Sequence, residues 1–328
     1  GQAGFADVIS EFLSDSSQEI KETAALSLGI LGNESSRDKL TALALNTPEG
    51  RSLVSKGGAA NEVDDRTRSF AIYGLGLLGY RTADNGIRQE IVDTLIAILE
   101  GDGMTSSQRD LSVAALSAIG LVPLDSQPDW TPPDEKDDDA TFRGNECREA
   151  QVQWTPDYYG NEEINFLVRA QCPTTLARLI QFADPRAQFE NEADKNFRDL
   201  KTLVARQLVE DIGRHSDKQN EIQQSCILAL GLIGDADEDE IDADIRKALT
   251  EVTKNIVDIQ SRNFSMVALA HVGGRPGQGD GDALAGTDDV RKTLMGQLSK
   301  GQGSLKPWAG LGLGVLERSL VDAGETPS

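Results

Sequence analysis

Ser225-Cys226-Ile227-Leu228-Ala229-Leu230-Gly231-Leu232-Ile233-Gly234 is the stretch that decides the fold, because its ten-residue pattern occurs six times in the chain. We call this pattern the register and number its positions one to ten. The sixth position is Leu in every copy, and the second and fifth positions always hold a small residue. The other copies are Thr23–Gly32, Phe70–Gly79, Leu111–Gly120, Phe264–Gly273 and Trp308–Glu317. A fixed internal period of this kind is typical of a stack of similar supersecondary units, in contrast to one closed core.

The register predicts helices that are apolar on more than one side. At about 100° per residue, positions two, five, six and nine share one face, which reads small, small, Leu, aliphatic. The eighth position is mostly apolar and lies beside the first, so each helix should pack against its own partner and both neighbours. Five copies end in Gly, which suits the left-handed turn that stops a helix. The last copy has Glu317 there and runs on, which we interpret as a terminal cap.

More polar amphipathic segments between the copies would supply the partner helices. Ile245-Arg246-Lys247-Ala248-Leu249 matches Val290-Arg291-Lys292-Thr293-Leu294, and Ile91–Leu95 is a looser echo. Pairing these segments with the register predicts an all-α fold, an alpha-alpha superhelix. The expected helix pairs lie at 4–32, 36–79, 86–120, 197–234, 240–273 and 287–320.

The interval between the third and fourth copies holds an insertion. Residues 121–161 contain five prolines, including Pro123 and Pro156, and are expected to be irregular. Residues 162–183 return to helical periodicity, interrupted at Cys172-Pro173. We therefore expect one continuous solenoid, with N-terminal helix pairs over 1–120, the insertion over 121–161 and C-terminal pairs over 162–328.

Three segments of the register give the chain a resemblance to a known class. Ala25–Gly32, Ile72–Gly79 and Leu228–Gly234 resemble helices of HEAT repeats, the armadillo-like superhelices of paired helices that repeat at about forty residues. They also look like the Leu-Gly-rich helices of the proteasome and cyclosome repeats. The resemblance covers most of the chain apart from the insertion. It implies a helical stack that presents surfaces to other macromolecules, and it implies little about chemistry.

The charge of the chain limits its partners. With 54 acidic and 32 basic residues the net charge is −22, which repels nucleic-acid backbones and anionic membranes. No apolar run approaches the ~18 residues of a membrane span, so no membrane insertion is expected. Three cysteines do not make a disulfide framework, which fits a reducing, cytoplasmic compartment. The chain begins Gly1-Gln2, not Met, so we expect a processed or excised piece whose targeting signal is out of view.

Several motifs imitate chemistry. Gly74-Leu75-Gly76-Leu77-Leu78-Gly79 matches the dinucleotide fingerprint, which works only between a strand and the opening of a helix. Here it closes a predicted helix, so we interpret its glycines as packing residues.

The only two histidines, His215 and His271, exclude the repeated His-Glu metal motifs of some HEAT-repeat enzymes. His271 holds the eighth register position and is expected to be a packing residue. His215 follows a predicted helix end. Cys226 occupies a small position and is expected to be a buried, inert thiol. We predict no catalytic residue, no metal ligand and no cofactor.

Two acidic runs remain. Asp235–Asp244 resembles the start of a calcium loop, because alternate carboxylates can converge on one hard cation. It lacks the Gly of the sixth place and has Arg246 at the twelfth, so we favour a helix N-terminus stabilised by acidic residues. Asp134–Asp139 is expected to be a solvated loop, and Gly273–Gly286 a flexible one.

The insertion carries five of the sixteen aromatic residues of the chain. Long loops are often functional, and aromatic rings often anchor contacts, so these rings are candidate partner-binding residues. The alternative is that they pack onto the stack and seal it. The five residues are Trp130, Phe142, Trp154, Tyr158 and Tyr159.

These patterns predict a non-enzymatic scaffold that binds another protein or peptide, with the insertion as its specificity element. A lyase-like or chaperone-like protein that acts on a bound small molecule is one alternative. A calcium-dependent structural or adhesive module is another.

Overall fold

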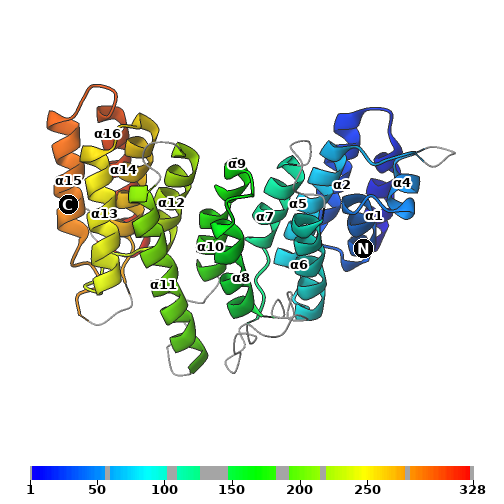
Figure 1. Cartoon of the computed structure of the whole chain (residues 1–328), viewed down its shortest axis with the longest axis horizontal. Helices are drawn as coiled ribbons and strands as arrows, with labels where there is room; N and C mark the ends of the chain where they lie inside the picture. The colour runs from blue at the N-terminus through cyan, green and yellow to red at the C-terminus, as the bar shows by residue number, and fades with distance from the viewer. Residues whose placement is uncertain are drawn as a thin grey trace. The chain divides into compact units, whose positions relative to one another are not determined.

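The computed structural model describes residues 2–55, 60–101, 109–125, 147–181, 192–214, 219–277 and 281–325. Among these residues all regular structure is helical and no strand occurs, which confirms the all-α fold class (Figure 1). The chain divides into two compact units, Gly1–Thr175 and Leu176–Ser328, and each is described by itself. The division falls at Thr175, beyond both predicted ends of the insertion. No helix in the described part of the chain is long and apolar enough to cross a bilayer.

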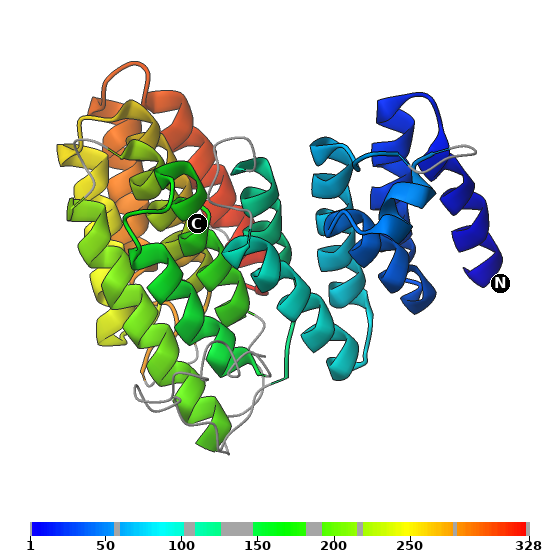
Figure 2. The same cartoon turned by 45° about the vertical axis from the view of Figure 1, so that its right-hand side comes forward.

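The first unit is built around three register helices, α2, α5 and α7. Helix α5 packs between α2 and α7, and the helices α3 and α6 pack against α5 as its partners (Figure 2). The helices of this unit are α1 Gln2–Glu11, η1 Phe12–Ser14, α2 Gln18–Leu31, η2 Glu34–Ser36, α3 Arg37–Ala44, α4 Pro48–Leu53, α5 Asp65–Arg81, α6 Asn85–Glu100, α7 Arg109–Ile119, α8 Arg148–Gly160 and α9 Phe166–Arg169, and α10 Cys172–Gln181 crosses its boundary.

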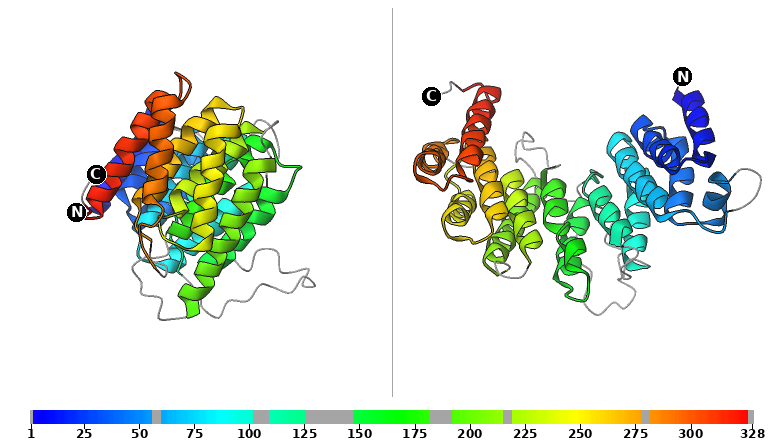
Figure 3. Two further views of the ribbon diagram at one scale, coloured as in Figure 1. Left: turned by 90° about the vertical axis from the view of Figure 1, so that its left-hand side faces the viewer. Right: turned by 90° about the horizontal axis from the view of Figure 1, so that it is seen from above.

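The second unit repeats the arrangement in two layers. Helix α14 packs between α12 and α16, and α13 contacts both α11 and α15 in the other layer (Figure 3). The helices are α11 Glu192–Arg214, α12 Asn220–Ile233, α13 Glu240–Asn255, α14 Ile259–Gly274, α15 Thr287–Lys300 and α16 Lys306–Asp322. The predicted helix pairs therefore correspond to helices in both units, with the second pair formed by α3, α4 and α5.

All six copies of the register lie on helices, and the sixth-position Leu is their central packing residue. Five of these leucines have no exposed surface, and burial of a Leu side chain stabilises a fold by roughly 1.5–3 kcal/mol. In the last copy Leu313 is partly exposed on α16, which packs against the register helix α14. The buried leucines are Leu28, Leu75, Leu116, Leu230 and Leu269.

Small residues bring successive register helices into close contact. A methyl group added to Gly29 would lie 2.3 Å from the carbonyl oxygen of Gly74, and one added to Gly231 would lie 2.7 Å from Cβ of Ala268. In these two contacts the seventh position of one copy thus meets the fifth position of the next, whereas Gly76 at the seventh position of the second copy meets Ala118 at the eighth position of the third. The sequence prediction used the second and fifth positions but missed the seventh, which is also Gly, Ala or Ser in every copy.

The left-handed turn predicted at the five tenth-position glycines occurs only at Gly32, although Gly120 and Gly234 also directly follow the ends of α7 and α12. Gly32 has φ of 66° and caps α2. Gly79 and Gly273 lie inside α5 and α14. A methyl group on Gly273 would lie 2.8 Å from Cβ of Val290, and one on Gly234 would lie 3.0 Å from Cγ2 of Ile245. These glycines make room for the helix that follows.

The prediction of an irregular segment over 121–161 is wrong for α8, Arg148–Gly160. Pro156 removes one backbone hydrogen bond, yet the helix continues because its buried face holds Ala150, Val152 and Tyr159. The return to helix over 162–183 is confirmed by α9 and α10, and Pro173 occupies the first turn of α10, where proline is tolerated.

Candidate functional site

The glycine-rich motif has the packing role expected for it. Gly74, Gly76 and Gly79 all lie within α5 and are buried. A methyl group on Gly76 would lie 2.8 Å from Cα of Ala118 in α7. Backbone N–H groups inside a helix already donate to carbonyl groups, so they are not available to a phosphate.

His271 and Cys226 have different surroundings. Cys226 is fully buried, as expected. The expectation that His271 packs in the interior is wrong, because its side chain is exposed on α14. Partial burial and the nearby charge of Arg275 lower the pKa of His271, so it is neutral at physiological pH. His215 lies outside the described residues.

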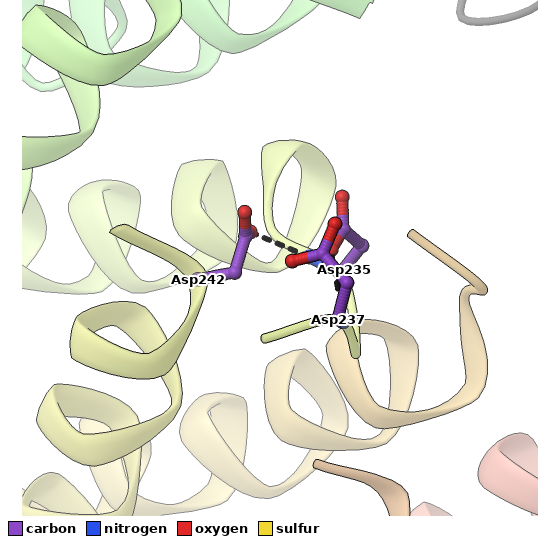
Figure 4. A group of neighbouring side chains, drawn as sticks. All are labelled: Asp235, Asp237 and Asp242. Carbon is purple, nitrogen blue, oxygen red and sulfur yellow. Dashed lines mark hydrogen bonds between the residues drawn. The ribbon is translucent and has the colours of Figure 1, made fainter. Parts of the chain in front are cut away.

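The acidic run between α12 and α13 brings three aspartates together in the second unit, and we call Asp235, Asp237 and Asp242 the aspartate cluster (Figure 4). One carboxylate oxygen from each lies within 4.8 Å of the others, and all three residues are buried. Asp242 stands in the first turn of α13 and accepts a hydrogen bond from the backbone N–H of Asp235 at 2.9 Å. The predicted helix N-terminus with acidic residues is therefore confirmed, and its burial was not foreseen.

Basic side chains compensate the aspartate cluster. Nζ of Lys201 in α11 lies 3.5 Å from Oδ2 of Asp235 and 3.7 Å from Oδ2 of Asp242. Arg246 donates to the carbonyl oxygens of Asp235 at 2.6 Å and Asp237 at 2.7 Å, which ties the loop to α13. Two carboxylates thus share one ammonium group, the arrangement that makes buried charge tolerable.

Burial sets the protonation of the cluster. It raises the pKa of Asp235 to about 7, with the charges of Asp242 and Asp237 adding to the increase and Lys201 opposing it. Burial also raises the pKa of Asp242, against the attraction of Lys201. One proton can therefore be held within the cluster near neutral pH.

The loop that carries the aspartate cluster forms hydrogen bonds with the segment between α14 and α15 through Ala236. The N–H of Ala236 donates to the carbonyl oxygen of Arg275 at 2.9 Å, and the N–H of Gly286 donates to the carbonyl oxygen of Ala236 at 2.8 Å. In the segment Gly273–Gly286, which was expected to be a flexible loop, Gly273 and Gly274 belong to α14, and Arg275 and Gly286 are held by these hydrogen bonds, while 278–280 lie outside the described residues. Hard cations prefer six to eight oxygen ligands. With two of its three carboxylates already paired with Lys201, the cluster is better suited to joining α11, α13 and this loop.

The five aromatic residues of the insertion are separated by the fold. Trp130, Phe142 and the acidic run Asp134–Asp139 lie outside the described residues, and Trp154 lies on α8. Tyr158 is half-buried and Tyr159 is 4 % exposed. The ring of Tyr159 lies 5.8 Å from the guanidinium carbon of Arg169, whose Nε donates to the Tyr159 carbonyl oxygen at 2.8 Å. Tyr159 therefore packs within its unit, as the alternative interpretation expects.

A different surface of the second unit is apolar and exposed. Register positions four and eight on α12, α14 and α16 are at least partly exposed and hold five large apolar residues and one histidine. The aromatic first positions of α14 and α16 are partly exposed as well, whereas Ser225, the first position of α12, is buried. We call this surface the outer stripe. Leu228 is 37 % exposed and Leu311 is 52 % exposed, whereas sixth-position Leu230 is fully buried. The stripe consists of Leu228, Leu232, Phe264, Val267, His271, Trp308, Leu311 and Val315.

The same positions are partly exposed on α2 and α5 of the first unit. Leu26 and Ile30 lie on α2, and Ile30 is 48 % exposed. Phe70, Tyr73 and Leu77 lie on α5 and are partly exposed. The sequence signal for these surfaces was the apolar eighth position beside the first, which was assigned to helix packing.

Comparison with known proteins adds no evidence on function to that of the fold and these surfaces. No protein-family model matches the chain, and no curated protein sequence matches it.

Proposed function

We propose that the chain is a HEAT-like helical solenoid that acts as a non-enzymatic protein-interaction scaffold. The observation that carries the proposal is the outer stripe, where the fourth register position is apolar and solvent-accessible on the neighbouring register helices α12, α14 and α16, and the eighth position is so on α12 and α16. Contiguous exposed apolar surface on a protein marks an interaction site more often than chance.

The chemistry of the stripe favours an amphipathic helix or peptide as the partner. Successive register helices pack side by side, so equivalent positions form rows across α12, α14 and α16. Rows of Leu, Val and aromatic side chains complement residues spaced by three or four on a partner helix. The net charge of −22 favours basic residues at the edges of that partner, because they raise its rate of association.

We also propose that the insertion is the specificity element of the scaffold, and that this role belongs to residues 126–146. Its ends lie next to each other, because the N–H of Arg148 donates to the carbonyl oxygen of Asp125 at 3.1 Å. Variation within residues 126–146 is therefore compatible with one fixed arrangement of Asp125 and Arg148.

The test is affinity capture with the double variant Leu228→Asp/Leu311→Asp. Both side chains are exposed, so the variant should fold like the wild type while placing charge in the middle of the stripe. Proteins retained by the wild type are identified by mass spectrometry, produced separately, and titrated calorimetrically against both chains. We expect the affinity of the variant to fall by at least about tenfold, which corresponds to about 1.4 kcal/mol.

The matched control is Leu203→Asp/Val257→Asp, which introduces the same charge at apolar residues outside the stripe. Leu203 is 63 % exposed on α11 and Val257 is 89 % exposed between α13 and α14. The control should bind like the wild type. Equal affinities for all three chains, or equal losses in both variants, would refute the stripe as the binding surface.

A further inference from the structure

His271 is the residue of the outer stripe that can gain a charge. The other five residues at the fourth and eighth register positions of α12, α14 and α16 are Leu or Val. The side chain of His271 is exposed, and Val267 lies one turn before it on the same face of α14. A partner that binds the outer stripe would therefore cover His271.

Register helices flank His271 on both sides, because α14 packs between α12 and α16. At the fourth and eighth positions these flanking helices carry Leu228 and Leu232 on α12, and Leu311 and Val315 on α16. Protonation of His271 thus places a positive charge in the middle of an apolar surface and not at its edge.

The helices α13 and α15 pack on the opposite side of α14. Gly273 lies against Val290 of α15 and follows His271 by two residues, which is about 200° around the helix. Nε of Arg262 donates to the carbonyl oxygen of Thr253 in α13 at 2.9 Å, and Arg262 precedes His271 by about 180° around the helix. The charged side chains of α13 and α15 therefore do not face His271.

The charges closest to His271 belong to the end of its own helix and to the aspartate cluster. Partial burial lowers the pKa of His271, and the positive charge of Arg275 adds to the decrease. Arg275 donates to the carbonyl oxygen of Leu232 at 2.8 Å, which fixes its position at the end of α12. The negative charges of Asp235 and Asp242 act on Arg275 in turn.

The flanking helices add little charge. Helix α12 contains no Asp, Glu, Lys or Arg from Ile222 to Ile233. On α16 the charged residues that follow Val315 are Glu317 and Arg318. Glu317 accepts a hydrogen bond from Nε of Arg291 at 2.8 Å, and Nε of Arg318 donates to Asp322 at 2.9 Å. Both charges are therefore engaged with neighbours on α15 and α16.

We propose that His271 makes binding at the outer stripe dependent on pH, so that a partner held at neutral pH is released on acidification. The inference rests on the proposed function, because it assigns a control to the same surface. A neutral imidazole ring can be covered by apolar side chains at a small cost, whereas a protonated ring must lose the hydration of its charge. Binding therefore favours the neutral form of His271.

The sign of the effect follows from the linkage between binding and protonation. A partner that covers the neutral form lowers the pKa of His271 below its value in the free chain. The affinity is then full above the free-chain pKa and decreases as the pH falls below it. That pKa lies below the ordinary value of about 6.5, so the stripe can bind at physiological pH and weakens at mildly acidic pH.

A designed helical peptide with blocked ends serves as the probe. It has leucines spaced by three and four residues, Gln at the other positions and one Lys near each end, so none of its groups titrates between about pH 5 and 8. Calorimetry at physiological ionic strength measures its affinity over this range. The pKa of His271 in the free chain is read from its C2 proton resonance, which His271→Gln assigns because the chain has two histidines.

We expect the affinity of the wild type for the peptide to fall by about tenfold per pH unit below the measured pKa of His271. His271→Gln cannot gain the charge and should bind the peptide equally well throughout. Asp235 titrates in both chains, so the difference between them isolates His271. His271→Arg carries a permanent charge and should bind weakly at every pH. Its control is Val257→Arg, which adds the same charge outside the stripe and should behave like the wild type.

Two outcomes overturn the role of His271 and leave the stripe in place. One is a wild-type affinity that does not change with pH, and the other is the same pH dependence in the wild type and in His271→Gln. In both cases the peptide must still be lost from the double variant Leu228→Asp/Leu311→Asp. A peptide that binds this double variant as tightly as the wild type binds elsewhere, which counts against the stripe itself and overturns the role of His271 with it.

Discussion

Gly273 lies directly against Val290, so closely that a methyl group on Gly273 would come within 2.8 Å of Cβ of Val290. Gly273 is the tenth residue of one register copy, and Val290 is the first apolar residue of the partner helix that follows. Gly234, the tenth residue of another copy, likewise lies against Ile245, which is equivalent to Val290 in the helix α13 that follows. Two sequence patterns that looked independent therefore meet at one contact in successive helix pairs.

Gly273→Ala should destabilise the protein. The added methyl group overpacks the contact with Val290, and overpacking costs roughly 1–3 kcal/mol. Gly296→Ala is the control, because its methyl group would meet no atom within 4 Å and Ala favours a helix over Gly by about 1 kcal/mol. Urea unfolding followed by circular dichroism should show opposite signs for the two variants. A Gly273→Ala chain as stable as the control would mean that the contact is loose.

Leu230→Ala tests the central packing of the register. Leu230 is fully buried in α12, and its truncation should cost roughly 2–5 kcal/mol. The exposed change Lys254→Ala should cost less than about 0.5 kcal/mol. Urea midpoints of the two variants provide the comparison, and equal midpoints would contradict the stacking of the register helices.

The stability of the protein should depend on the protonation of Asp235. Its folded-state pKa of about 7 lies above the ordinary value of about 3.9, so the folded chain binds this proton more tightly than the unfolded chain. The stabilisation that the folded chain gains by binding this proton is fully present below about pH 4 and is lost as the pH rises through about 7. The stability of Asp235→Asn relative to the wild type should therefore increase as the pH rises from about 4 to about 7.

The measurement is the difference in unfolding free energy between Asp235→Asn and the wild type at several pH values. Glu238→Gln, an exposed neighbour in the same loop, is the control and should show a nearly constant difference. A difference for Asp235→Asn that is equally constant from pH 4 to 8 would show that the aspartate cluster does not titrate as a buried group.

Chelators should leave the melting temperature of the wild type unchanged, because Lys201 already supplies positive charge to the aspartate cluster. Lys201→Met removes that charge and should lower the melting temperature, since buried carboxylates are left without their ion-pair partner. Calcium should then stabilise the variant more than the wild type. Differential scanning fluorimetry with and without calcium measures both effects. A rise of several degrees in the wild type would instead support the calcium module.

Replacing residues 126–146 with a short Gly-Ser linker should leave the helices intact. Asp125 and Arg148 are joined by a backbone hydrogen bond, so a short linker spans the gap, and loop length changes closure entropy by only about 0.6 kcal/mol per doubling. Helicity and melting temperature should stay close to those of the wild type, while partner capture should be lost. A large loss of stability would show that Trp130 and Phe142 pack against the first unit.

The sequence by itself determined the helices and their pairing. Helical periodicity is a local property, since residues three and four apart share a face wherever the helix finally lies. Six copies of one pattern therefore located the register helices, the buried leucines and the need for close approach. Helix α8 could also have been predicted from the sequence, because its buried residues Val152, Thr155 and Tyr159 follow a helical spacing. The prediction failed because Pro156 was taken to break any helix.

Only the tertiary structure decided which faces are covered and which charges meet. The eighth register position is apolar in five of the six copies, yet Ala118 is buried against Gly76 of α5, while Ile30 on α2 and His271 on α14 are exposed. Lys201 and Asp242 lie 41 positions apart in the chain, and their 3.7 Å contact exists because α11 packs against α13. Burial and electrostatic pairing depend on neighbours that are distant in sequence, and a periodic pattern carries no information about them.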